Sequence, residues 1–80
     1  MKIKSNLAIS DTGFIFNPTT GESFSANTIG ATVIKLIKEN KSLDEIKTYI
    51  VDNFDTDEVT VEKDISDFLF ILKQYNILED

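Results

Sequence analysis

The chain has 80 residues and a formal net charge of −6, and it contains neither cysteine nor histidine. This length allows one domain, residues 1–80, with a single modest core and little room for a deep catalytic cleft. Without cysteine or histidine, the sequence excludes disulfides, thiolate chemistry, the commonest general base and the commonest transition-metal ligand.

The charge is divided unevenly along the chain. Residues 1–41 carry five lysines and three carboxylates, whereas residues 42–80 carry three lysines and eleven carboxylates. An acidic second half repels phosphate backbones, so nucleic acid is not expected as a partner. The longest apolar run, Phe68 to Leu72, is far shorter than the ~20 residues of a membrane span, and no apolar run follows Lys2 and Lys4. We therefore expect a cytoplasmic protein with no membrane partner.

Three short strands are predicted in the first third of the chain. Residues 2–10 place apolar side chains at alternate positions, and a turn at residues 11–13 leads to a second strand at residues 14–17. Residues 18–21 form the next turn, and residues 22–26 form the third strand. Short hairpin loops favour an antiparallel meander, in which the first and third strands are the edges.

Three helices are predicted after the meander. The first runs from an N-cap at Asn27 to about Lys38, with its apolar residues spaced for one face. A capping box at Ser42–Glu45 begins the second helix, and the third helix begins between Asp57 and Thr60. The predicted core stripe of the third helix is Val61, Ile65, Phe68, Leu72 and Tyr75. The predicted fold class is α+β: a winged-helix-like domain with a three-stranded antiparallel β-meander followed by three α-helices.

The order and spacing of these motifs resemble the PqqD family, whose fold is also called the precursor-peptide recognition element. The resemblance extends from Phe14 to Leu78. Its matching positions are Ala26-Asn27, Gly30, Val33-Ile34, Leu36-Ile37, Ser42-Leu43-Asp44-Glu45-Ile46, Asp64-Ile65, Phe68-Leu69, Leu72 and Asn76-Ile77-Leu78. Two family glycines are replaced here by Asn40 and Asn76, and asparagine is the next-best residue for a left-handed backbone.

The resemblance implies a non-enzymatic protein, without a cofactor, that binds the leader of a ribosomally made precursor peptide. It also implies that the leader adds as a strand to the third strand and packs against the third helix. The bound leader is then presented to a modifying enzyme, often a radical S-adenosylmethionine enzyme.

Residue chemistry supports such a site on the third strand and the third helix. Residues 22–26 contain no proline or lysine and include small serines, so a visiting backbone can pair with this edge. On the third helix, Phe70 lies opposite the core stripe. It either packs on the N-terminal strand or forms an apolar floor with Ile71, beside two carboxylates suited to leader lysine or arginine. The candidate peptide-binding residues are Glu22, Ser23, Phe24, Ser25, Ala26, Asp64, Asp67, Phe70 and Ile71.

Three alternatives remain open at this point. A winged-helix DNA-binding domain fits the predicted shape, but the third helix offers Lys63 and Lys73 against several carboxylates. The domain could instead bind a protein partner, or pair with a second copy as a homodimer through the exposed edge. An enzyme is disfavoured because no phosphate-binding glycine loop and no metal-ligand spacing is present, so no metal site is expected.

Overall fold

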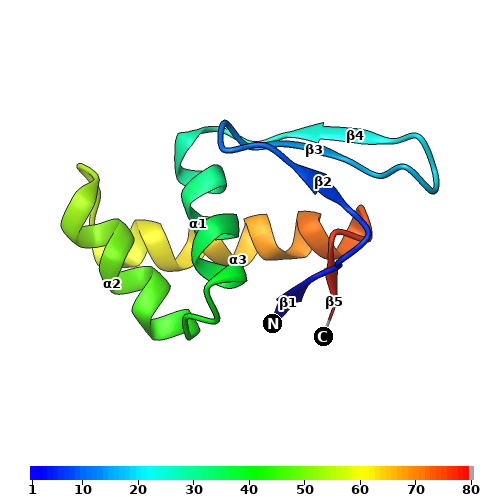
Figure 1. Ribbon diagram of the computed structural model, residues 1–80. Coiled ribbons are helices and arrows are strands. Elements are labelled where there is room, and N and C mark those ends of the chain that lie inside the picture. Colours follow the sequence, from blue (N-terminus) through cyan, green and yellow to red (C-terminus); the bar gives the residue numbers. More distant parts are fainter. Residues whose placement is uncertain (80) are drawn as a thin grey trace.

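The computed structural model describes residues 1–79. In chain order, the described residues form β1 (Lys2–Ile3), β2 (Ala8–Ile9), β3 (Phe14–Phe16), β4 (Ser23–Ser25), α1 (Thr28–Lys38), α2 (Leu43–Asn53), α3 (Glu58–Gln74) and β5 (Leu78–Glu79) (Figure 1). The predicted class, a three-stranded antiparallel meander followed by three helices, is confirmed. Among residues 1–79, no helix is both long enough and apolar enough to cross a membrane.

Residues 2–10 form two strands in separate sheets, not the single strand that the alternation predicts. β1 pairs antiparallel with β5, which places Ile3 opposite Leu78, whereas β2 pairs with β3. After β1, the Lys4 N–H donates to the Ile77 carbonyl at 2.9 Å, so the chain stays with the C-terminal strand before it turns toward β3. The larger sheet has the order β2-β3-β4, and β4 is therefore an edge strand within the described part of the chain.

Each helix begins at a polar side chain that satisfies a free backbone N–H of the first turn. The Asn27 side-chain oxygen accepts a hydrogen bond from the Gly30 N–H at the start of α1, at 2.8 Å. At the start of α2, Ser42 and Glu45 form both hydrogen bonds of the predicted capping box. Asp57 accepts from the Thr60 N–H at 2.7 Å and so starts α3 within the predicted interval. The hydrogen bond from the Ser42 N–H lowers the pKa of Glu45, and that from the Thr60 N–H lowers the pKa of Asp57.

Both asparagines that replace family glycines adopt a left-handed backbone. Asn40 follows α1 with φ of 64°, and Asn76 follows α3 with φ of 57°. Beyond Asn76, the Ile77 N–H donates to the Leu72 carbonyl at 2.9 Å, which closes the helix end and turns the chain back. This fold-back, expected for residues 77–78, brings β5 alongside β1.

The core lies between the sheets and the three helices, and α3 packs against both α2 and β5. Its buried apolar residues are Ile3, Ile15, Val33, Ile34, Leu36, Ile37, Ile46, Ile50, Val61, Ile65, Leu72, Ile77 and Leu78. The predicted α3 stripe is confirmed for its aliphatic members. It is wrong for Tyr75, which is 44% exposed at the helix end and lies against the Phe24 ring at a centroid distance of 5.3 Å. Phe68 is only partly buried, because it faces the boundary between core and surface.

Candidate functional site

The open edge of β4 presents the main-chain groups of two serines. At either end of β4, the Ala26 N–H donates to the Gly13 carbonyl at 2.9 Å, and the Glu22 carbonyl accepts from the chain after β3 at 2.8 Å. In an antiparallel ladder, residues that bond to the neighbouring strand alternate with residues that do not. Ser23 and Ser25 therefore direct their N–H and carbonyl groups away from β3. Of the five strand residues predicted for the site, these two offer backbone bonds to a guest.

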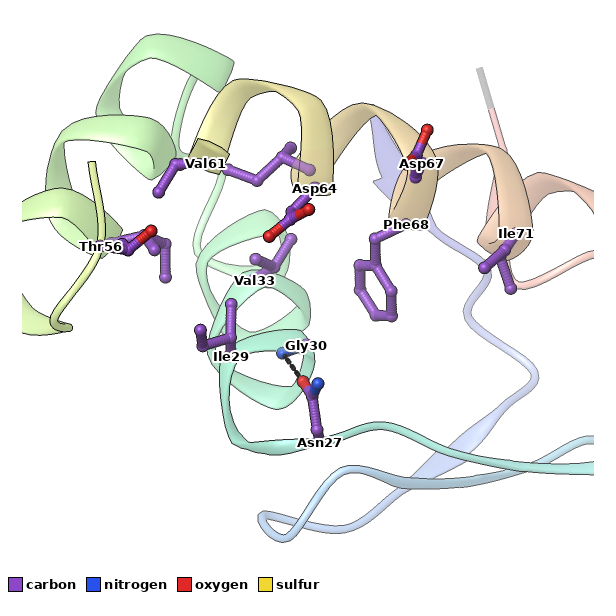
Figure 2. Close-up of a pocket in the computed structure, with 12 residues that line it drawn as sticks. Asn27, Ile29, Gly30, Val33, Thr56, Val61, Asp64, Asp67, Phe68 and Ile71 are labelled. Carbon is purple, nitrogen blue, oxygen red and sulfur yellow. Dashed lines mark hydrogen bonds between the residues drawn. The ribbon is translucent and has the colours of Figure 1, made fainter. Parts of the chain in front are cut away.

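A groove of about 260 Å³ begins directly after β4 and runs between α1 and α3 (Figure 2). Most of its lining is apolar, and polar groups come from both helices and the connection before α3. The lining residues are Asn27, Ile29, Gly30, Val33, Ile50, Thr56, Val61, Asp64, Ile65, Asp67, Phe68 and Ile71. The structure thus brings together three of the four site residues predicted on α3: Asp64, Asp67 and Ile71.

The Phe68 ring joins the groove to β4. Its centroid lies 6.3 Å from that of Phe24, the middle residue of β4. Toward α1, the ring reaches Gly30 so closely that a Cβ there would lie 2.9 Å from Phe68 Cζ. Figure 2 shows this ring directed from α3 toward the start of α1, where Asn27 caps the helix. Helical periodicity assigned Phe68 to the core. The small residue at position 30 is the sequence signal that could have placed the ring in a groove.

Phe70 lies away from the groove, although its neighbour Ile71 lines it. Successive residues of a helix turn by ~100°, so these two side chains leave α3 in different directions. Phe70 is 61% exposed, which excludes a place in the core, and the expectation that it could pack on the N-terminal strand is wrong. Of the two strands that residues 2–10 form, β1 packs against α1 and β5, and β2 packs against β3. The five predicted strand residues, 22–26, are also not part of the groove lining; Glu22, Ser23 and Phe24 line a small separate hollow near Tyr75.

The α3 side of the groove is negatively charged. Asp64 has no cationic partner among residues 1–79, and its side chain points toward α1 (Figure 2). Asp67 forms an ion pair with Lys63 at 3.7 Å, but both side chains are well exposed, and such pairs contribute little and open easily. A cationic side chain entering the groove would therefore meet available carboxylate oxygens. Within residues 1–79, no cluster of carboxylates is arranged to hold a metal ion.

Comparison with solved structures finds close matches over the whole fold. One is described as TbiB1 in complex with the TbiA(beta) leader peptide; it is 32% identical, with a TM-score of 0.89, and the match covers 99% of this chain and 95% of that one. A second is described as lasso peptide synthetase B1 complexed with the leader peptide; it has the same TM-score at 13% identity, covers 99% and 96% of the two chains, and shows the fold alone. No curated protein sequence matches the chain.

The family model described as coenzyme PQQ synthesis protein D (PqqD) matches residues 13–78, from the turn before β3 to the start of β5. This match includes β4, α1 and α3, the elements that form the open edge and the groove. The resemblance seen in the sequence from Phe14 to Leu78 is thereby confirmed over its full extent, and the chain belongs to the PqqD family.

Proposed function

We propose that this chain binds the leader segment of a ribosomally made precursor peptide as an additional strand on β4. The observation that carries the proposal is an unpaired strand edge that leads directly into an apolar groove. Strand addition uses such an edge for main-chain affinity and neighbouring side-chain pockets for specificity. The description of TbiB1 as a complex with a leader peptide supports the same class of ligand here, because the two chains are 32% identical over nearly their full lengths.

The ladder of β3 and β4 defines how a guest strand would lie. Guest residues opposite Ser23 and Ser25 exchange main-chain hydrogen bonds with them, because these serines direct their groups outward. The guest residue between them lies opposite Phe24 and turns its side chain to the α3 side of the sheet, toward Phe68. Glu22 and Ala26 position the two ends of β4 through their bonds to the preceding strand.

Side chains of α3 would then recognise the part of the leader that follows the strand. Ile71 and Phe68 offer apolar contact, and the carboxylates of Asp64 and Asp67 attract leader lysine or arginine. Phe70 lies outside the groove, and we assign it contact with leader residues that pass over the outer side of α3. Ordering a flexible peptide offsets part of the interaction energy, so the complex should be reversible, as release to an enzyme requires.

Members of this family are accessory proteins without catalytic activity. We propose that the chain presents its bound leader to a modifying enzyme, of which a radical S-adenosylmethionine enzyme is the class that the family resemblance implies. Presentation would take place in the cytoplasm, where ribosomal peptides are made. With the leader held between β4 and α3, the outer surface of α2 stays available to that enzyme.

A selection from random peptides tests the binding function and does not require the sequence of the precursor. Peptides about 12 residues long can span both β4 and the groove at ~3.3 Å per residue. We expect enriched peptides that bind the chain, shift the amide resonances of β4 and α3, and fail to bind a Ser25→Pro variant. No enriched peptide, or resonance shifts confined to α2 and β2, would contradict the proposal.

A further inference from the structure

The outer face of the three-stranded sheet carries two exposed aromatic side chains with small neighbours. Phe14 and Phe16 flank the buried Ile15 on β3 and are 47% and 38% exposed. On β4, Ser25 lies opposite Phe14 and Ser23 lies opposite Phe16. We call the pair Phe14 and Phe16 the outer ridge. It lies one strand inside the open edge, and on this face of β4 the side chains between ridge and edge are those of two serines.

The ladder fixes which guest residues would share this face. Ser23 and Ser25 form non-hydrogen-bonded pairs with the ridge residues, and in such pairs the side chains of neighbouring strands approach closely. Directly opposite residues in adjacent strands point to the same face of a sheet. A strand added to β4 therefore places one side chain beside each serine, on the same face as the ridge.

We propose that the outer ridge is a second subsite for the leader, which takes large apolar side chains, aromatic or long aliphatic, from the two residues opposite Ser23 and Ser25. The inference rests on the proposed strand addition to β4. A guest side chain must cross two strand spacings, about 10 Å between Cα atoms, which two large side chains can span together. Serine fills little of that space, so the guest side chain can lie across it and reach a phenylalanine ring.

The size and chemistry of this face favour a peptide over a folded partner. A phenylalanine side chain buries roughly 150–250 Å² when covered, so two that are about half exposed offer on the order of 200 Å². A stable protein–protein interface needs about 800 Å² from each partner. The five residues that form this face, Ala8, Phe14, Phe16, Ser23 and Ser25, include no charge, unlike the groove with its two carboxylates. The two faces of the guest strand thus meet different chemistry, apolar outside and apolar with acidic groups inside.

Parallel selections from the random peptide library provide the test. They are run on the wild-type chain, on the double variant Phe14→Ser/Phe16→Ser, and on Tyr49→Ser as a matched control. Tyr49 is an aromatic residue of α2 that is 45% exposed and lines a different hollow. On the wild type and the control, we expect large apolar residues to be enriched at positions on both faces of the guest strand. On the double variant, enrichment at the outward positions should disappear while the inward pattern remains.

A double-mutant cycle of binding affinities then measures the contact between the outward peptide side chains and the outer ridge. Peptide positions that respond to Gly30→Ala are assigned as inward, and their immediate neighbours are outward. Replacing the two outward residues by alanine should weaken binding to the wild-type chain roughly tenfold and leave binding to the double variant unchanged. Equal losses on both chains overturn the subsite. The subsite is also overturned if the alanine-substituted peptide binds the wild-type chain as tightly as the original peptide. This second result does not depend on whether the double variant folds.

The outcomes also separate this inference from the binding function beneath it. One outcome would overturn the subsite and keep strand addition. In it, the selected peptides lose affinity for Ser25→Pro but bind the Phe14→Ser/Phe16→Ser variant as tightly as the wild type. A selection that yields no peptide sensitive to Ser25→Pro overturns both.

Discussion

The two edges of the three-stranded sheet differ in length, charge and surroundings. β2 is two residues long, and its Ile9 borders two hollows that are lined by Lys2, Lys4, Lys35 and Lys38. Neither strand itself contains lysine or proline, but β4 is three residues long and the groove beside it contributes two carboxylates. Short strands and lysines are features that prevent an edge from pairing with another chain. The comparison indicates that β2 is protected whereas β4 is open to a guest strand.

The same comparison shows where the unevenly distributed charges of the sequence lie in the structure. Four of the five lysines in residues 1–41 lie in the hollows beside β2, whereas Asp64 and Asp67 of the second half lie on α3 beside the groove. A guest with lysine or arginine is therefore attracted toward the β4 side and repelled from the β2 side. In the proposed binding mode, this difference in charge favours the β4 edge, where the main-chain hydrogen bonds then form.

Closing the β4 edge should have the largest effect. In Ser25→Pro, the outward N–H is lost and the ring obstructs the guest backbone, so peptide affinity should fall by at least about a hundredfold. Ser25→Ala keeps the N–H and should bind like the wild type. Titration calorimetry measures both affinities, and circular dichroism checks that the helices remain. If Ser25→Pro binds normally, β4 is not the docking edge.

Filling the groove from α1 should have the next largest effect. The Cβ added in Gly30→Ala would lie 2.9 Å from Phe68 Cζ, so the ring must move toward the groove, and we expect roughly tenfold weaker peptide binding. Alanine favours a helix over glycine by about 1 kcal/mol, and this gain opposes the cost of moving the Phe68 ring. The melting temperature should therefore change little. Thr32→Ala, on the side of α1 that faces β2, is the control and should leave affinity unchanged. A large loss of stability without loss of affinity would show that Phe68 belongs to the core alone.

Charge variants sharpen the contrast between the two sides of the molecule. Asp64→Asn with Asp67→Asn should weaken a lysine-bearing peptide by about three- to tenfold and reduce the salt dependence of its affinity. The same variant should bind a peptide without lysine or arginine as the wild type does. Lys35→Gln with Lys38→Gln, on the β2 side, should not weaken either peptide. Equal losses from both pairs of substitutions would mean that charge does not distinguish the sides.

The smallest effect is expected at Phe70. Because its side chain is 61% exposed, Phe70→Ala should leave the melting temperature nearly unchanged, and we expect it to weaken peptide binding by a factor of about three or less. Thermal denaturation and calorimetry on the same sample separate stability from binding. A collapse of the melting temperature would contradict the exposed position of this ring.

Local features of this fold could be predicted from sequence because their causes lie within a few residues. The caps at Asn27 and Ser42 and the left-handed Asn76 depend on backbone groups close in sequence, and all three are confirmed. The division of residues 2–10 could not be predicted, because it depends on pairing with β5, more than 70 residues away. Alternation of apolar residues describes one long strand as well as two short ones.

The site was predictable in part for the same reason. An edge strand without protective residues is visible in sequence, and so is an aromatic residue away from the core stripe, as at Phe70. The groove was not predicted, since it forms where Gly30 of α1 meets Phe68 of α3; the small residue at position 30 hints at a close approach but does not name its partner on α3. Helical periodicity separates buried from exposed faces, but it does not show which part of the exposed face a second helix will border.

Amide hydrogen exchange at Ser23 and Ser25 tests the central claim most directly. In the free chain both N–H groups point away from β3 at an open edge, so they should exchange rapidly. Binding of a selected peptide should slow the exchange of both amides strongly, whereas the amide of Ile9 on β2 should show no change. Peptide binding that leaves Ser23 and Ser25 exchanging as fast as before would contradict strand addition to β4.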